Sequence, residues 1–183
     1  MTGGRNRGNR VAQAITPTNV EAFFDKDDII VSKTDLKGRI TYANQTFCGI
    51  AGYSEAELMG QPHSIIRHPD MPRAVFKLLW DTLFEGREVF AYVKNMARSG
   101  AYYWVFAHVT PSFDRDKKVI GFHSNRRVPD PKIVATIMPV YSAVLQEERR
   151  HNNGQAALAA GFKMVGDFLQ SKNMSYDEFI FSL

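Results

Sequence analysis

The chain has 183 residues, 44% of them hydrophobic and 12% aromatic, so it can form one domain with appendages and bury a sizeable core. Its single cysteine excludes an internal disulfide framework. Within these residues no apolar run is long enough to span a bilayer, and no apolar segment follows the N-terminal basic residues. We therefore expect no transmembrane helix, no secretory signal and a cytoplasmic location.

The formal net charge of +4 comes mostly from the N-terminus. Arg5, Arg7 and Arg10 lie in the first twenty residues, which contain no acid, and the remainder of the chain carries only +1. This Gly/Asn/Arg-rich composition predicts a disordered basic tail over residues 1–18, rather than an arm that binds nucleic acid or inserts into a membrane.

The first ordered elements are predicted to be a short helix and a hairpin. Asn19–Phe24 is compatible with a short helix, and Ile29–Thr34 reads as a strand. Asp35–Gly38 then forms a turn, and Arg39–Ala43 returns as the second strand.

Two short helices are predicted next from their capping residues. Asn44 can cap a helix through its side-chain oxygen, with Phe47 and Ile50 facing inward. Ser54–Glu57 has the pattern of a capping box and predicts a second helix that stops at Gly60.

The stretch Ile66–Pro72 is the most informative in the chain, because it places a cation, an imidazole, a carboxylate and two prolines between apolar helical patterns. Pro72 suits the first position of a helix. Asp70 lies near that start, where the helix dipole favours negative charge. Local structure gives no role to Arg67 or His68.

A longer helix is predicted from Pro72 to Phe84, ended by Gly86. Its apolar residues recur at three- and four-residue spacing: Val75, Phe76, Leu79, Trp80 and Leu83. Three strand-like segments follow at Glu88–Asn95, Ala101–Pro111 and Val119–Arg126. Helices inserted between antiparallel strands predict an α+β domain with helices packed on one face of the sheet.

The C-terminal third is predicted to be helical. Residues 130–150 carry an apolar stripe that we expect to pack on the core, and Pro139 should kink that helix or begin it. Residues 155–170 form a second amphipathic helix, which is the better candidate for a dimer or partner surface. The apolar segment 176–183 should not remain free in water. The predicted organisation is therefore a tail (1–18), a domain (19–128) and a helical extension (129–183).

No catalytic constellation is evident, so an enzyme is the least expected class. The sequence has no Gly-rich phosphate loop, nucleophile elbow or nucleophile with a partnered base. His63 and His68 lack the partners of a usual zinc spacing, and we expect no metal site. Several polar residues instead fall at element ends around the predicted core, and Trp80 lies on the facing helix. A cavity with a few placed polar groups and an aromatic wall suits a flat cofactor.

Several of these segments resemble a known family. The opening of a PAS domain is similar to Asp35–Asn44, Gly52–Ser54 and Gly60–His63. The PAS sensor of the bacterial aerotaxis, or energy-taxis, receptors is similar to the run His63–Pro72, Trp80, Val93–Asn95 and Gly100–Val105. The Arg-His-Pro-Asp-Met-Pro string is much more specific than the general PAS pattern. The resemblance covers roughly residues 19–148.

The resemblance implies the PAS fold, a five-stranded antiparallel sheet with helices over its inner face, and non-covalent binding of FAD whose redox state is sensed. It implies that Asn44, Arg67, His68 and Asp70 support FAD binding. It also implies that His63, Trp80 and Asn95 line the isoalloxazine. The expected partners are a chemotaxis-type or other signalling protein and a second copy of the chain. The family's transmembrane and relay regions are absent from these 183 residues, so the sequence reads as a stand-alone sensor.

Two segments depart from the family pattern. Met96-Ala97 stands where the family usually has a basic pair, which weakens any phosphate role for that turn. Before Val-Lys-Asn the family usually carries Pro-Trp and a glycine, whereas this chain has Glu88–Tyr92, and the missing aromatic could reshape a flavin pocket. Two alternatives therefore stay open: a haem-binding PAS gas sensor with His63 or His68 as axial ligand, and a cofactor-free PAS dimerisation module. Cys48 lies in the wrong segment for a photoadduct with flavin.

Overall fold

The computed structural model describes residues 15–183 of the chain, so the predicted basic tail lies almost entirely outside the described residues. The elements, in chain order, are β1 (Ile30–Thr34), β2 (Ile40–Ala43), α1 (Gln45–Ala51), α2 (Glu55–Leu58), the 3₁₀ helix η1 (His63–Ile66), α3 (Arg73–Phe84), β3 (Val89–Met96), β4 (Tyr102–Phe113), β5 (Val119–Arg127), α4 (Pro131–Arg149), α5 (Gly154–Ser171) and α6 (Tyr176–Phe181). Among these described residues, no helix is both long and apolar enough to cross a membrane.

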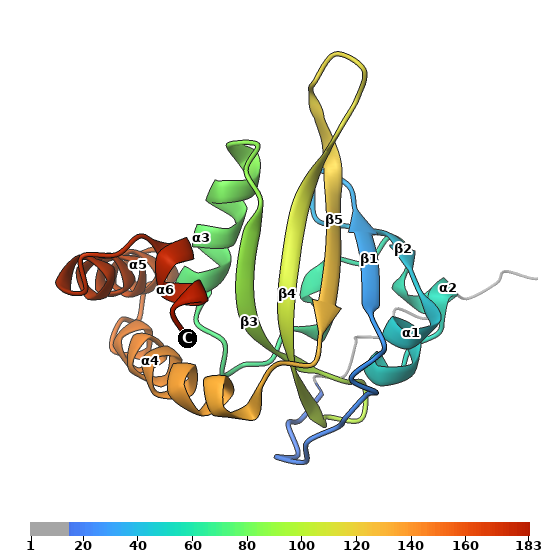
Figure 1. Cartoon of the computed structure of the whole chain (residues 1–183). Coiled ribbons are helices and arrows are strands. Elements are labelled where there is room, and N and C mark those ends of the chain that lie inside the picture. Colours follow the sequence, from blue (N-terminus) through green and yellow to red (C-terminus); the bar gives the residue numbers. More distant parts are fainter. Residues whose placement is uncertain (1–14) are drawn as a thin grey trace, which may run out of the picture.

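The strands form one antiparallel sheet in the order β2-β1-β5-β4-β3. The edge strand β2 pairs with β1, and β1 pairs with β5, so the first and the last strand of the chain are neighbours in the middle of the sheet. The helices α1 and α2 lie beside the β2 edge, and α3 lies beside the β3 edge (Figure 1). The expected α+β class and five-stranded antiparallel sheet are confirmed.

Alternation along the strands gives the sheet two different faces. On β3, Val93 and Asn95 face α3 and the interior, whereas Phe90 and Tyr92 face the opposite side. That opposite face is covered in part by the C-terminal helices. The hydroxyl of Tyr141 on α4 donates to the Tyr92 carbonyl at 2.9 Å.

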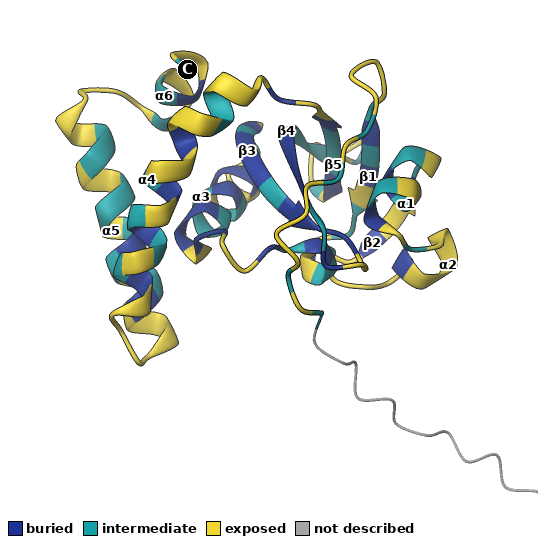
Figure 2. Ribbon diagram, turned by 90° about the horizontal axis from the view of Figure 1, so that it is seen from below, coloured by how far each residue is buried: buried dark blue, intermediate teal, exposed yellow. Residues whose placement is uncertain are grey.

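The C-terminal helices pack on the domain as a group (Figure 2). Ile137 and Tyr141 of α4 are buried in the main core, which confirms that the helix predicted at 130–150 packs on it. Ile180 of α6 is also buried, and Phe181 lies 4.8 Å from Phe90 between ring centroids. The apolar tail is therefore ordered against the sheet.

The predicted use of α5 as a dimer or partner surface stays a prediction, because the apolar residues Leu158, Phe162, Val165 and Leu169 are half-buried, although part of the helix packs within the chain. The helix lies beside α3 and α4 (Figure 1), with Ala157 and Gly161 buried between them. Phe168 packs edge-on against Phe179 of α6 at 5.1 Å. This part of the helix therefore packs within the chain.

The helix predicted at Asn19–Phe24 is wrong. This segment runs alongside the start of β4, where Ala22 N donates to Tyr102 O at 2.7 Å and Tyr102 N donates to Val20 O at 2.9 Å. A six-residue segment lacks the length to offset helix nucleation, and pairing with a strand edge satisfies its backbone instead.

The structure also decides three details of the predicted helices. Pro72 precedes α3 as its N-cap residue rather than occupying the first helical position. The carboxylate at the start of α3 is Glu148, from α4, and not Asp70: its two oxygens accept from Arg73 N and Ala74 N at 2.9 and 2.8 Å. Pro139 lies inside α4 and does not begin it.

Candidate functional site

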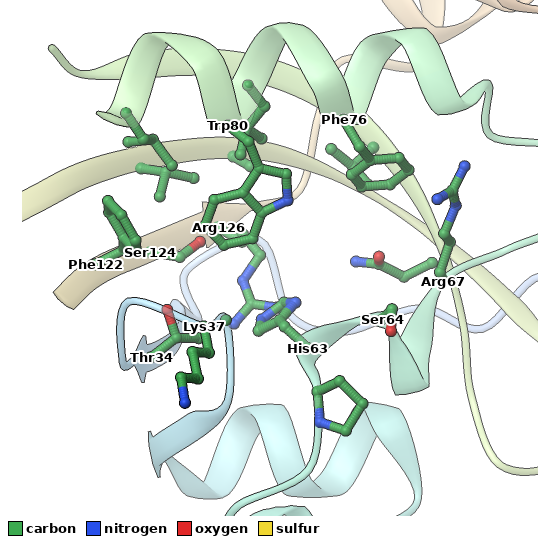
Figure 3. Close-up of a pocket in the computed structure, with 18 residues that line it drawn as sticks. Thr34, Lys37, His63, Ser64, Arg67, Phe76, Trp80, Phe122, Ser124 and Arg126 are labelled. Atoms are coloured by element: carbon green, nitrogen blue, oxygen red, sulfur yellow. The ribbon is translucent and has the colours of Figure 1, made fainter. Parts of the chain in front are cut away.

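A cavity of about 290 Å³ lies between the inner face of the sheet and α3. Trp80 and Phe76 project into it from α3, and Arg126 and His63 approach from the opposite side (Figure 3). Apolar side chains from α3 and from strands β3 and β4 complete much of the lining: Leu79, Leu83, Val93, Ala107 and Val109. The cavity is therefore largely apolar, with polar groups at a few defined points.

Trp80 forms an aromatic wall that is held by its neighbours. Its ring packs edge-on against Phe122 at 5.3 Å and stacks on Phe84 at 5.9 Å. On the hairpin turn, a Cβ added to Gly38 would lie 3.2 Å from the Trp80 ring, and Gly38 has a φ of +71°. Glycine is therefore favoured at this turn both by its backbone conformation and by the close approach of the indole.

Asn95 presents an unused hydrogen-bond donor to the cavity. Its residue is 4% exposed, it lines the cavity, and its Nδ2 has no partner among residues 15–183. A buried donor without a partner costs roughly 1–3 kcal/mol. On the backbone, Asn95 forms an isolated antiparallel bridge with Arg67, which joins the strand to the segment before α3.

Arg126 is a buried cation at the same cavity. It is 2% exposed, donates from Nη2 to the Ser32 hydroxyl at 2.6 Å and lies 4.4 Å from the centroid of the Phe47 ring. Its Nε and Nη1 have no partner within the described residues. Burial lowers the pKa of Arg126 to about 10. The guanidinium therefore remains charged at neutral pH and supplies two free donors to a site that lacks a carboxylate.

His63 lies beside Arg126 as a neutral imidazole. Its Nε2 is 3.1 Å from the Ser32 hydroxyl, and its ring stacks on Phe47 at 5.8 Å. Burial lowers the pKa of His63 to about 3, and the charge of Arg126 acts in the same direction. The ring thus has one face against the core and an edge at the cavity.

Arg67 stands at the margin of the cavity. Its Nη2 donates to Met71 O at 3.1 Å, and its guanidinium lies 4.3 Å from the Phe76 ring centroid. His63, Arg67, Trp80 and Asn95 are therefore the predicted site residues that the fold brings to one cavity.

The other three predicted residues do not line it. Asn44 uses its side chain on the backbone: Oδ1 accepts from Val31 N and Phe47 N, and Nδ2 donates to Ile29 O. The predicted helix cap is confirmed, and the same amide also ties α1 to β1.

His68 and Asp70 form a separate cluster with Lys94. His68 is 1% exposed and its Nδ1 accepts from Asp70 N at 3.1 Å. Burial raises the pKa of Asp70, but the hydrogen bond and charge of Lys94, 2.8 Å away, outweigh it and the pKa is lowered. This cluster braces the segment between η1 and β3, next to the bridge from Arg67 to Asn95.

Sequence reasoning missed Arg126 and Thr34. Both line the cavity, and Thr34 Oγ1 is buried without a partner in the described part of the chain. Strand alternation could have indicated Arg126, because Phe122, Ser124 and Arg126 share one face of β5. The segment Val89–Ala91, which differs from the family pattern, does not line the cavity. Cys48 does not line it either.

Comparison with known proteins identifies similar sequences. A family model described as the PAS fold matches residues 40–126. The aerotaxis receptor of Escherichia coli (strain K12) is 42% identical over 118 residues, which are 64% of this chain and 23% of the receptor. A nitrogen fixation regulatory protein of Klebsiella pneumoniae is 33% identical over 104 residues, 55% of this chain and 21% of that protein. The chain thus spans less than a quarter of the length of these curated relatives.

Solved structures agree on the fold. The blue-light photoreceptor Aureochrome1 LOV in its dark state superposes with a TM-score of 0.54 at 19% identity, covering 62% of this chain and 85% of the other. An RNA-binding light-oxygen-voltage receptor gives a TM-score of 0.55 at 17% identity, covering 69% and 37%. At these identities the likeness concerns the fold alone.

Proposed function

This chain contains a PAS domain over residues 40–126, and from that premise we propose that it is a cytoplasmic sensor that binds FAD non-covalently and relays the redox state of the flavin to a signalling partner. The similarity to an aerotaxis receptor supports a sensory role. The cavity supports the choice of ligand.

The observation that carries the proposal is the set of free donors in an aromatic cavity. Asn95 Nδ2 and Arg126 Nε and Nη1 are buried, unpartnered within residues 15–183, and carried by residues that line the same space as Trp80. A flavin ring is flat and carries carbonyl oxygens and ring nitrogens along one edge. Such a ligand would pack against the indole and accept from these donors, so the residues present fit it.

When bound, a flavin supplies a centre that takes up electrons and a proton at its ring. Asn95 can hydrogen-bond to the ring in either protonation state, because its amide has a carbonyl acceptor on one side and an NH₂ donor on the other. A rotation of the amide exchanges one for the other at the same point of the cavity. In this proposal, the orientation of the Asn95 amide depends on whether the flavin ring is protonated.

The position of Asn95 on β3 could transmit such a rotation to other parts of the chain. Its backbone pairs with Arg67 on one side and with Tyr103 on the other. Three residues earlier on the same strand, the Tyr92 carbonyl accepts from Tyr141 of α4. A shift of β3 would therefore move α4, and we propose the C-terminal helices as the output element toward a signalling protein or a second copy of the chain.

A redox rather than a photochemical role is favoured by the place of the cysteine. Cys48, the one cysteine of the sequence, lies on α1 and does not line the cavity. Burial raises the pKa of its thiol, so it is a poor nucleophile. No thiol of the described residues is thus available to a ligand in this space.

The test is the visible absorption spectrum of the purified protein before and after dithionite. We expect the bands of an oxidised flavin, bleached on reduction. Replacing Asn95 with Ala removes a donor and should weaken FAD binding about tenfold, equivalent to ~1.4 kcal/mol. The matched control is Asn125→Ala, on the same sheet, where the side chain bonds His123 rather than lining the cavity.

Three results would contradict the proposal. A Soret band would identify a haem protein instead, with His63 as the histidine at the cavity. A colourless protein that takes up no flavin on refolding, together with a tight dimer, would identify an interaction module. If Asn95→Ala and Asn125→Ala weaken FAD binding equally, Asn95 does not contact the flavin.

A further inference from the structure

A second cavity, of about 600 Å³, adjoins the first. Ser64 and Arg67 line both, so both cavities border the segment around η1. Much of the lining of the second cavity comes from the C-terminal helices. The residues are Leu145, Glu148 and Arg149 of α4 and Gly154 and Ala157 of α5. These residues lie beyond residue 126, outside the matched PAS region.

The second cavity carries an excess of positive charge. Arg67, Arg73 and Arg149 contribute three guanidinium groups against the single carboxylate of Glu148. That carboxylate is occupied by the backbone of α3, since Arg73 N and Ala74 N each donate to one of its oxygens.

The charges around the arginines of this cavity are unevenly balanced. Burial lowers the pKa of Arg67; the charge of Glu148 opposes this shift and has a larger effect than that of Arg73, which adds to it. Arg149 forms no ion pair with any residue in 15–183. An anionic ligand would therefore supply Arg149 with a counter-charge.

The rest of the lining is apolar enough for a base. Ile15, Met71, Met96 and Leu145 contribute to it, and Asn152 adds an amide. The first cavity, at about 290 Å³, has room for a ring system but not for a dinucleotide, since drug-sized ligands fill roughly 300–1,000 Å³. A ligand longer than the ring must extend out of the first cavity, and the second cavity is a neighbouring space, since it shares Ser64 and Arg67 with the first.

We propose that the second cavity binds the adenosine diphosphate half of the flavin dinucleotide, with Arg67, Arg73 and Arg149 at the pyrophosphate. This inference rests on the proposed function and assigns part of the cofactor site to the C-terminal helices. It makes Arg149 a determinant of the preference for FAD over flavins without the nucleotide.

The test uses the full chain, stripped of cofactor and titrated with riboflavin and with FAD while flavin fluorescence is followed. The wild type should bind FAD at least tenfold more tightly than riboflavin. Arg149→Ala should raise the Kd for FAD about tenfold and leave that for riboflavin unchanged. ADP alone should compete with FAD for the wild type and compete less well for the variant.

Arg150→Ala is the matched control. Arg150 is the next residue, it is exposed and paired with Glu147 at 2.7 Å, and it does not line the second cavity. Its substitution should change neither Kd. Both arginines lie at the surface, so both variants should keep the fold, which circular dichroism verifies.

Two outcomes separate this inference from the proposed function. Equal affinity of the wild type for riboflavin and FAD, or an equal effect of Arg149→Ala on both, overturns the second site while leaving a flavin sensor intact. Failure of every flavin to bind overturns the proposed function and the second site together.

Discussion

If the cavity binds FAD as proposed, Arg126 should have opposite effects on the ligand-free and the ligand-bound protein. A buried guanidinium with two unpartnered donors destabilises the empty fold, because little in the protein replaces the water it loses. Arg126→Met should therefore leave the ligand-free protein as stable as the wild type or more stable by about 1 kcal/mol. The same change should weaken FAD binding at least tenfold. Urea denaturation and flavin titration measure the two effects.

The neighbouring Arg127, which is exposed, supplies the control for this change. Arg127→Met should leave both the unfolding free energy and the FAD affinity close to the wild type. A large loss of stability in Arg126→Met without any loss of affinity would show that the guanidinium is structural.

His63 predicts a pH dependence of stability. An unfolded histidine titrates near 6.5, whereas burial and Arg126 lower the pKa of His63 to about 3 in the fold. Below pH 6.5 the unfolded chain binds a proton that the folded chain excludes, so the contribution of His63 to stability is lost progressively from pH 6.5 down to about 3. Between pH 7 and pH 5 the loss is about 2 kcal/mol.

The variant His63→Gln lacks this titration. Its unfolding free energy, measured in urea at pH 7, 6 and 5, should therefore fall about 2 kcal/mol less than that of the wild type over this range. Parallel curves for the two proteins would mean that His63 is protonated in the folded state.

At the element scale, one carboxylate joins three helices. Glu148 of α4 accepts from the first backbone amides of α3, and a Cβ added to Gly161 of α5 would lie 2.7 Å from its side chain. Because α3 carries Trp80 and Phe76, the C-terminal helices are fixed to the helix that lines the cavity. A carboxylate at a helix start is stabilised by both hydrogen bonds and the helix dipole.

Two glycines on α5 test this joint with opposite expected signs. At Gly161, an alanine methyl would collide with Glu148, which its bonds to α3 hold in place, so Gly161→Ala should destabilise by about 1–3 kcal/mol. At Gly166 nothing lies within 4 Å of an added Cβ, so Gly166→Ala should stabilise by roughly 0.5–1 kcal/mol through helix propensity. Urea denaturation distinguishes them, and a gain of stability in both would mean that the helices are not closely joined.

At the scale of the whole molecule, the cavity predicts that the ligand and the fold stabilise each other. A ligand that binds only the folded chain at 100 times its Kd adds about 2.7 kcal/mol. For a chain of this size that corresponds to a rise in Tm of roughly 5–10 °C. Thermal unfolding with and without FAD measures it. An unchanged Tm under saturating FAD would contradict binding to the folded state.

The order of the elements could be predicted from the sequence because it depends on local patterns. Turn glycines, capping residues and apolar periodicity act over a few residues, so the hairpin, α3, the three later strands and the C-terminal helices all agree with their predictions. The segment 19–24 fails because its backbone is satisfied by a strand edge about 80 residues away, which no local pattern reports.

The sequence by itself determined the α+β class, the element boundaries to within a few residues, and the presence of Arg67, Trp80 and Asn95 in a recognisable motif. The tertiary structure decided which polar residues share a cavity. It placed Arg126 at the cavity with two donor atoms that have no partner in residues 15–183, left Asn44, His68 and Asp70 outside the cavity lining, and set Glu148 at the start of α3. The physical reason is that a cavity is made by strand register and by contacts between distant segments, whereas a sequence motif records only neighbours along the chain.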